Sequence, residues 1–342
     1  MTRSTEAAPN VRPWVDGVID AAPGLQVPPN ACRVAWRSSL IPWLLGALAV
    51  ALMSCGTALA AEPLHAVGVE NEYADVIAQI GGRYVRVTAI ETDPNTDPHS
   101  FEASPAIARA IAAANLVVRN GAGYDSWVER ILSATPSAGR KVIDVQSLLG
   151  LPDSTPNPHV WYDPKTMPAV ARAVAAELSA LDRPEAGYFQ ANARRFQASL
   201  EPWRQAIAAF KARYGGTRIA VTEPVANYLL EAAGCDIATP LSLATAIMNG
   251  TDPSPQDVAT EEALLTGHEV KVLVYNRQVT DTLTESFLDL ARRSGIPVVG
   301  VYETLPIPGY RYQSWMLAEV AALRRAVADK VSTETLGKAN TP

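Results

Sequence analysis

Cysteine is scarce in this sequence, and most of it lies near the N-terminus. Cys32 and Cys55 fall within the first 60 residues, and only Cys235 follows them. A single thiol in the rest of the chain can form neither an intrachain disulfide nor a cysteine metal cluster. Cys235 is therefore expected to be a small, buried apolar residue.

Blocks of like charge, long polar tracts and internal repeats are also missing. The 29 basic and 35 acidic residues are interspersed and give a formal net charge of −6. Because no basic patch stands out, we expect no nucleic-acid partner. With 48% hydrophobic and 19% charged residues in a chain of 342, the composition fits one large or two medium globular domains.

The first 60 residues have the pattern of a secretory leader. Arg33 and Arg37 precede an apolar run at 40–53, and Ala58-Leu59-Ala60 places small residues at the positions that a signal peptidase reads. We expect cleavage after Ala60 and a periplasmic mature protein. An uncleaved membrane anchor is an alternative, but the apolar run is short for a span.

A lipoprotein is the second alternative for this leader. Cys55 in the run Leu-Met-Ser-Cys at 52–55 would carry the lipid, although Met53 fits that signal poorly. The residues upstream of Arg33 precede any normal signal peptide and lack helical periodicity. They suggest that the true start lies near Val34.

Beyond the leader, short apolar runs alternate with helical patterns in two blocks. This alternation predicts parallel sheets with helices on both faces. The expected strands are 65–70, 84–90, 116–120, 141–145, 218–222, 270–275 and 298–302. The expected helices are 73–80, one that opens at Ser104 and Pro105, 225–233, 255–265, 281–294 and 312–328.

Between the two blocks, apolar residues recur at helical spacing over 184–214. A helix of this length would span roughly 45 Å, enough to join two lobes. Pro202 is expected to kink it or to start a new turn. The predicted organisation is a leader at 1–60, a first metal-binding lobe at 61–183, a linking helix at 184–214 and a second metal-binding lobe at 215–330.

Two of the 4 histidines lie in matched loop phrases. His99 belongs to residues 97–102 (Asp-Pro-His-Ser-Phe-Glu), and His159 to residues 157–164 (Asn-Pro-His-Val-Trp-Tyr-Asp-Pro). Histidine is the commonest metal ligand, and the preceding proline stiffens each loop. We predict that both histidines bind metal; the alternative is that they are ordinary loop residues.

Two carboxylates complete the predicted site. Ligands of open α/β sheets bind beyond the carboxyl ends of the strands, and Glu223 and Glu303 directly follow the expected strands 218–222 and 298–302. With His99 and His159 they give two ligands per lobe. Alternatively, Glu223 is a helix-initial carboxylate before Pro224, and Glu303 is a solvent-facing loop acid.

The chain resembles the zinc/manganese-type solute-binding proteins of bacterial ABC metal-uptake transporters. The resemblance runs from about 65 to 328, and its segments are 69–73, 81–82, 97–102, 120–124, 157–161, 222–224 and 295–299. It implies two α/β lobes joined by one long rigid helix, with the metal ion held between them.

The resemblance also assigns the four ligand positions. His99 and His159 fall on the first two. Glu223 falls on the third, which is histidine in typical zinc carriers and glutamate in many manganese carriers. Glu303 falls on the fourth, where aspartate is more usual. The chain lacks the histidine-rich loop of many zinc carriers.

The implied function is capture of a divalent transition metal in the periplasm and its delivery to an ABC permease, by a monomer that is not an enzyme. Carboxylates favour Mn²⁺, while imidazoles suit Zn²⁺ and Fe²⁺, so the cargo stays open among these. A metal-dependent enzyme is an alternative, because two histidines and a carboxylate also form an iron site. A surface adhesin is another, by analogy of fold. Four protein ligands tend to close a metal site, which favours the carrier.

Overall fold

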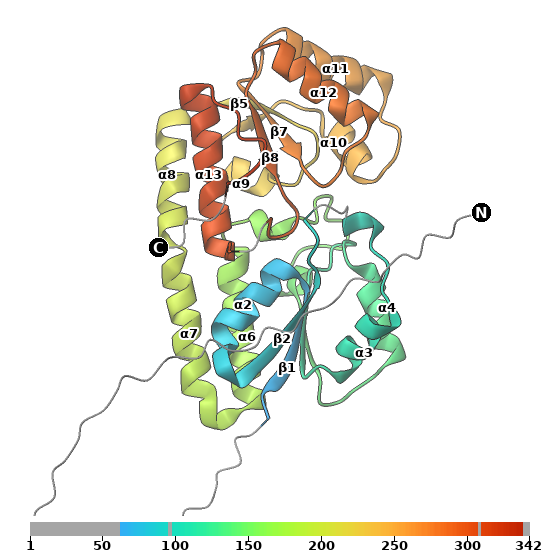
Figure 1. Ribbon diagram of the computed structural model, residues 1–342, viewed down its shortest axis with the longest axis vertical. Helices are drawn as coiled ribbons and strands as arrows, with labels where there is room; N and C mark the ends of the chain where they lie inside the picture. Colours follow the sequence, from blue (N-terminus) through green and yellow to red (C-terminus); the bar gives the residue numbers. More distant parts are fainter. Residues whose placement is uncertain (1–61, 95–97, 307–308, 338–342) are drawn as a thin grey trace, which may run out of the picture. The chain divides into compact units, whose positions relative to one another are not determined.

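The computed structural model describes residues 62–94, 98–306 and 309–337. The predicted leader, its cleavage after Ala60, the lipid on Cys55 and the start near Val34 lie outside these residues. Contacts group the chain from Ala61 onward into one compact unit. Within it, two parallel four-stranded sheets form two α/β lobes (Figure 1), so the predicted fold class is confirmed.

The first sheet has the order β2-β1-β3-β4 with every pair parallel. Its strands are β1 (Leu64–Glu70), β2 (Val85–Glu91), β3 (Leu116–Arg119) and β4 (Lys141–Asp144). Its helices are α2 (Asn71–Gly81), α3 (Pro105–Ala113), α4 (Ser126–Ala134), α5 (Val145–Leu148) and α6 (Thr166–Leu181).

The second sheet repeats this topology in the order β6-β5-β7-β8, again with every pair parallel. Its strands are β5 (Arg218–Val221), β6 (Asp236–Ile237), β7 (Val272–Asn276) and β8 (Val298–Val301). Its helices are α9 (Asn227–Ala232), α10 (Leu241–Met248), α11 (Pro255–Thr266), α12 (Thr282–Arg293) and α13 (Tyr312–Asp329).

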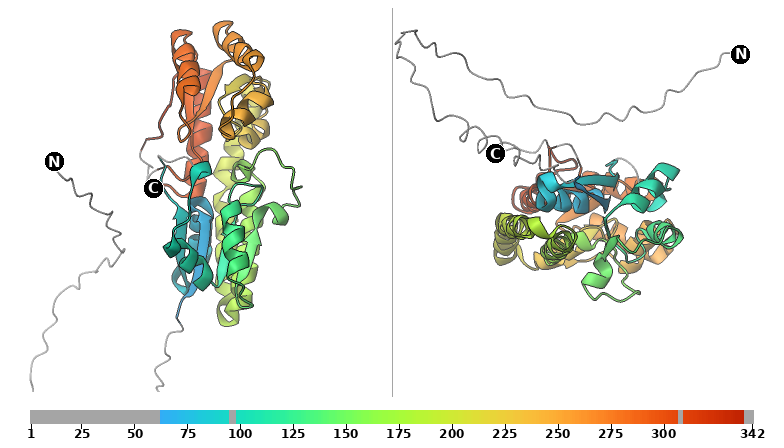
Figure 2. Two further views of the ribbon diagram at one scale, coloured as in Figure 1. Left: turned by 90° about the vertical axis from the view of Figure 1, so that its right-hand side faces the viewer. Right: turned by 90° about the horizontal axis from the view of Figure 1, so that it is seen from below.

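Both faces of each sheet are buried, as parallel sheets require. Along β1, Ala66 packs into one hydrophobic cluster, whereas Val67 and Val69 pack into another. Along β5, Ala220 faces one cluster, and Ile219 faces the cluster on the opposite side. Successive side chains of each strand thus point to opposite faces of the sheet. Helices cover both faces, as the views in Figure 2 show.

The linking segment is helical but not one uninterrupted helix. It consists of α7 (Ala186–Ser199) and α8 (Glu201–Tyr214), which follow each other in Figure 1 with Leu200 between them. Pro202 lies in the first turn of α8. Proline has no N–H to continue the hydrogen bonding of a preceding helix, so it starts a new one.

A second connection between the lobes was not predicted. The helix α13 packs along α8 (Figure 1), yet its first residues contact the first lobe. The backbone N–H of Tyr312 donates to Asp75 over 2.8 Å, and its hydroxyl donates to the carbonyl of Trp161 over 2.6 Å. The side chain of Gln313 pairs with that of Gln79. These contacts supplement the linking segment in holding the lobes together.

Several large aromatic side chains are packed in the interior. Trp161, Trp203 and Trp315 are fully buried, and Trp127 nearly so. Cys235 is only partly buried, against the main core, and this burial raises the pKa of its thiol to about 12.

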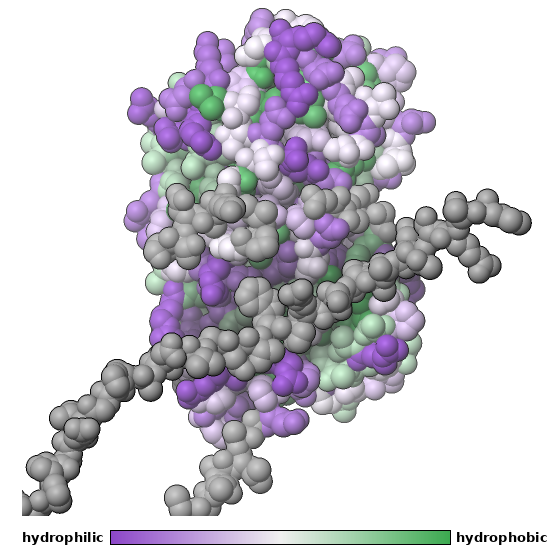
Figure 3. Space-filling view, viewed as in Figure 1, coloured by the Kyte–Doolittle hydropathy of each residue, from purple (hydrophilic) through white to green (hydrophobic). Residues whose placement is uncertain are grey.

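Hydrophilic residues predominate over α11 and α12 on the face shown in Figure 3. Among the described helices, none has the length and apolarity needed to cross a bilayer.

Glu319 gives a testable consequence of this packing. Its buried carboxyl accepts a hydrogen bond from Trp315 over 2.9 Å, and burial raises its pKa from 4.5 to about 8. Between these values the unfolded chain releases a proton that the folded chain keeps, so stability falls as pH rises. Metal-free Glu319→Gln should therefore melt above the wild type at pH 8 and close to it near pH 5. An equal difference at both values in thermal denaturation would contradict this.

Candidate metal centre

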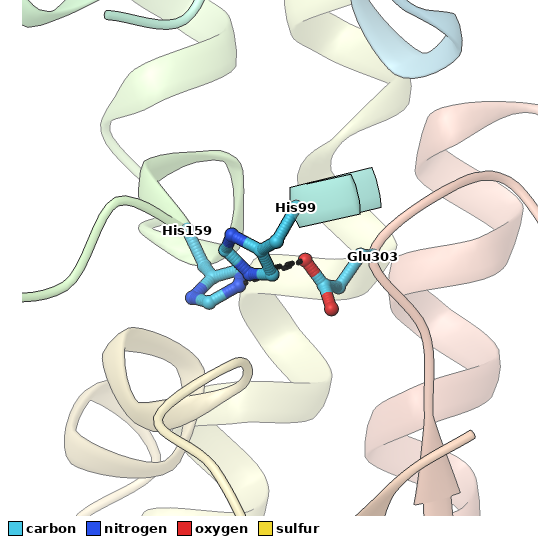
Figure 4. A group of neighbouring side chains, drawn as sticks. All are labelled: His99, His159 and Glu303. Atoms are coloured by element: carbon cyan, nitrogen blue, oxygen red, sulfur yellow. Dashed lines mark hydrogen bonds and ion pairs between the residues drawn. The ribbon is translucent and has the colours of Figure 1, made fainter. Parts of the chain in front are cut away.

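Three of the four predicted ligands come together. The side chains of His99, His159 and Glu303 point toward one another in Figure 4, and their candidate ligand atoms all lie within 4.8 Å of each other. The Nε2 atoms of His99 and His159 lie 3.3 and 3.1 Å from Oε2 of Glu303. A tetrahedral zinc ion with bonds of about 2.0–2.1 Å would separate its ligand atoms by roughly 3.4 Å. The spacing therefore suits a metal ion.

Each of these side chains comes from a loop at the carboxyl ends of the strands of a sheet. His99 lies in a 3₁₀ turn at Pro98–Ser100, and His159 directly precedes a second one at Val160–Tyr162. Glu303 follows β8 in the second lobe. The glutamate, with one methylene more than the usual aspartate, reaches both histidines. Its full burial excludes the alternative of a solvent-facing loop acid.

Asn157 fixes the tautomer of His159. The amide Nδ2 of Asn157 donates to the carbonyl of Pro224 over 2.7 Å, so Oδ1 is the end that faces the histidine ring. Oδ1 lies 2.8 Å from Nδ1 of His159, which must therefore carry the proton. In the neutral ring the lone pair then sits on Nε2.

The lone pair on Nε2 of His159 points at Oε2 of Glu303, which is also a hydrogen-bond acceptor. Nε2 of His159 lies 3.1 Å from Oε2 of Glu303, and both side chains are completely buried. Burial is the main effect on His159 and lowers its pKa below 6.5, despite the opposing effect of Glu303. A neutral imidazole and a carboxylate would repel each other here unless a proton or a cation lies between them. The pair is therefore built to hold a positive charge.

Glu303 is kept in its ionised form. Burial opposes ionisation, but the positive charge that His159 and His99 carry when protonated outweighs it and holds the pKa of Glu303 below its usual range; a bound cation would supply the same charge. Oε2 also accepts a hydrogen bond from the hydroxyl of Tyr124 over 2.9 Å. A buried anion whose ion-pair partners are two histidines is a strong ligand for a divalent cation.

A tight turn brings Tyr124 to the site. Gly121, Ala122 and Gly123 all have positive φ angles, of 76°, 52° and 81°. Glycine adopts this region without strain, which explains two of the three residues. The backbone N–H of Tyr124 closes the turn on the carbonyl of Gly121 over 3.0 Å.

Glu223 lies beside this group but not in it. Its buried Oε1 accepts a hydrogen bond of 3.2 Å from Nδ2 of Asn276, and the same nitrogen donates to Oε1 of Glu303 over 2.7 Å. One amide therefore separates the two carboxylates. Glu223 also precedes the N-cap of α9, Ala226, so it is not helix-initial. Its role as the fourth ligand stays a prediction.

Several residues that shape the site were not predicted from the sequence. Asn157 lies two positions before His159, within the phrase that was recognised. Asn276 ends β7, beside the end of β5, where the strand order changes direction. Ligands bind at such switch points, so its position was an available signal. Gln278, whose side-chain oxygen accepts the N–H groups of Glu303 and Thr304 over 2.7 and 3.0 Å, gave no signal.

Comparison with known proteins places this geometry in context. The model of the family described as zinc-uptake complex component A, periplasmic, matches residues 70–326. The manganese-binding lipoprotein MntA of Bacillus subtilis (strain 168) is 23% identical over 280 residues, which cover 78% of this chain and 87% of MntA.

Two solved structures share the fold. The SBP FpvC from Pseudomonas aeruginosa, in complex with Mn²⁺, has a TM-score of 0.65 at 21% identity and covers 79% of this chain and 100% of its own. The laminin-binding protein Lbp of Streptococcus pyogenes has a TM-score of 0.63 at 19% identity and covers 78% of this chain and 99% of its own. At these identities the likeness extends to the fold alone.

Proposed function

Because the chain belongs to the periplasmic zinc-uptake complex component A family, we propose that it captures a divalent transition metal ion in the periplasm and delivers it to an ABC permease. The observation that carries this proposal is the pair formed by His159 and Glu303, in which two buried acceptors face each other 3.1 Å apart. A divalent cation between them satisfies both.

The proposed ligands are His99, His159 and Glu303, with Glu223 as the fourth. Zinc and manganese are the proposed cargoes, and iron(II) is the third candidate. The manganese-binding relative and the Mn²⁺ complex of a structural neighbour support a metal of this class. The mixed set of imidazoles and carboxylates suits the same metals.

Carriage and catalysis differ in what the bound metal does. A carrier holds one ion tightly, without turnover, whereas an enzyme leaves a coordination position for substrate. We propose the carrier, acting as a monomer. Elemental analysis of protein purified from the periplasm should find about one transition-metal ion per chain. Cells that lack the chain should take up less of that metal, and uptake should return with the wild type but not with His159→Ala. Equal uptake in all three strains would contradict the proposal.

The affinity for metal should depend on pH in one direction. A histidine must be neutral to bind metal, and burial lowers the pKa of His159 from 6.5. Protons therefore compete with the metal only below the usual histidine range. We expect constant zinc affinity from pH 8 to about 6.5 and a progressive fall below it. Isothermal titration at several pH values measures this, and constant affinity down to pH 5 would argue against histidine ligands.

Glu223 should influence the choice of metal. The substitution Glu223→His replaces an anionic oxygen with an imidazole, and manganese depends more than zinc on such oxygens. The ratio of zinc to manganese affinity should rise by about tenfold or more. Competitive titration of the two metals gives this ratio, with Glu231→His on α9 as a matched exposed control. An unchanged ratio would remove Glu223 from the site.

A further inference from the structure

We infer that Asn276 limits Glu303 and Glu223 to one metal-binding oxygen each and thereby makes the site favour zinc over manganese. This inference rests on the proposed function and concerns the same site. It depends on the contacts of one buried amide.

Asn276 holds both carboxylates from a single nitrogen. Its side chain, only 1% exposed, ends β7 between the two acids. Nδ2 donates to Oε1 of Glu303 over 2.7 Å and to Oε1 of Glu223 over 3.2 Å. An amide nitrogen has two protons, so it can serve both oxygens at once.

The orientation of this amide is fixed by its other contacts. Its oxygen accepts the backbone N–H of Gln278 over 3.0 Å. The backbone N–H of Asn276 donates to Oγ1 of Thr222 over 3.1 Å. If the amide were flipped, its oxygen would face two carboxylates and its nitrogen would face a donor. The NH₂ group therefore stays directed at the acids.

The two carboxylate oxygens of Glu303 therefore have different partners. Oε1 is held by Asn276, whereas Oε2 faces both histidines and the hydroxyl of Tyr124. Because Oε1 is held by Asn276 while Oε2 faces the two histidines, Glu303 presents Oε2 alone to a metal ion between them. The contact between Asn276 and Glu223 has the same effect on the second carboxylate.

This arrangement favours a low coordination number. Two imidazole nitrogens and two single oxygens make four donors, the tetrahedral set that zinc prefers. Manganese prefers octahedral, oxygen-rich coordination. It would reach six donors from these residues only if both carboxylates chelated with both oxygens. Asn276 opposes that change at each of them.

The wild-type protein supplies the first test. Cobalt(II) replaces zinc in such sites and absorbs visible light strongly when four-coordinate and weakly when six-coordinate. We expect the strong spectrum for the cobalt-loaded full chain. The weak, six-coordinate spectrum would overturn the inference without any variant.

The second test removes the donor. Asn276→Leu keeps most of the side-chain volume and excludes water that could replace the amide. The zinc-to-manganese affinity ratio should fall by about tenfold or more, and the cobalt absorption should weaken. If the leucine variant does not fold, Asn276→Ala is measured in the same way. An unchanged ratio and spectrum would overturn the inference.

Asn192→Ala is the matched control. Asn192 is another buried asparagine, and it donates to the carbonyl of Ile80 over 2.8 Å, away from the metal centre. Its removal should leave the ratio and spectrum as in the wild type; a parallel shift would overturn the inference by tying the ratio to stability. If the wild type binds zinc, manganese and cobalt and only the Asn276 effect is missing, the inference alone fails. If it binds none of them, the proposed function fails with it.

Discussion

Replacing His159 by alanine should lower zinc affinity by at least about a hundredfold, the largest effect expected of any histidine in the chain. The ring is completely buried, its tautomer is fixed by Asn157, and its Nε2 lies 3.1 Å from Glu303. Alanine removes the donor and leaves the carboxylate without one of its partners. Titration of zinc, followed by the fluorescence of the neighbouring Trp161, measures the loss; the two rings have centroids 5.3 Å apart.

The alanine variants of His99 and His65 provide two comparisons for the loss of affinity in His159→Ala. The side chain of His99 is 22% exposed, so its replacement by alanine should cost about tenfold or more but less than that of His159. His65 lies exposed on β1, and its replacement by alanine should change nothing. Equal affinity in His159→Ala and His65→Ala would remove His159 from the site.

Replacing Glu303 by glutamine should lower zinc affinity by a similar factor, about a hundredfold, and reduce stabilisation by the metal. Glutamine keeps the shape of the side chain but removes the buried negative charge that two histidines and Tyr124 surround. A wild-type chain that binds zinc only when folded should melt higher in its presence. In thermal denaturation at one zinc concentration, the rise in the midpoint should be smaller for Glu303→Gln than for the wild type.

Glu319→Gln is the matched control for this variant. It makes the same substitution at another buried glutamate, on α13 rather than in the centre. Its melting temperature should still rise with zinc, by as much as in the wild type. If Glu303→Gln kept the full response to zinc, Glu303 would not be a metal ligand.

Much of the fold follows from local patterns in the sequence. Each expected strand, and each helix with a stated range apart from the linking one, is present within two residues of its predicted ends, because apolar runs and caps such as Ser104 act locally. The two-residue strand β6 and the helices α4, α5 and α10 were missed. The strand is too short to show a period, and α5 has only four residues.

The contacts within the metal centre were harder to predict from the sequence than the fold was. His99 and His159 stand in phrases that can be read directly, and Glu303 follows a strand. The contacts that give these ligands their properties join residues far apart in the sequence, such as Tyr124 and Glu303. The same holds for the amide of Asn276 between Glu223 and Glu303. Only the folded sheets bring such groups together.

The most direct test of the central claim is a crystal structure of the zinc-loaded protein with anomalous diffraction at the zinc absorption edge. One strong peak should lie within about 2.0–2.2 Å of Nε2 of His99, Nε2 of His159 and Oε2 of Glu303. A peak elsewhere, with these three side chains still hydrogen-bonded to one another and no ion between them, would contradict the account.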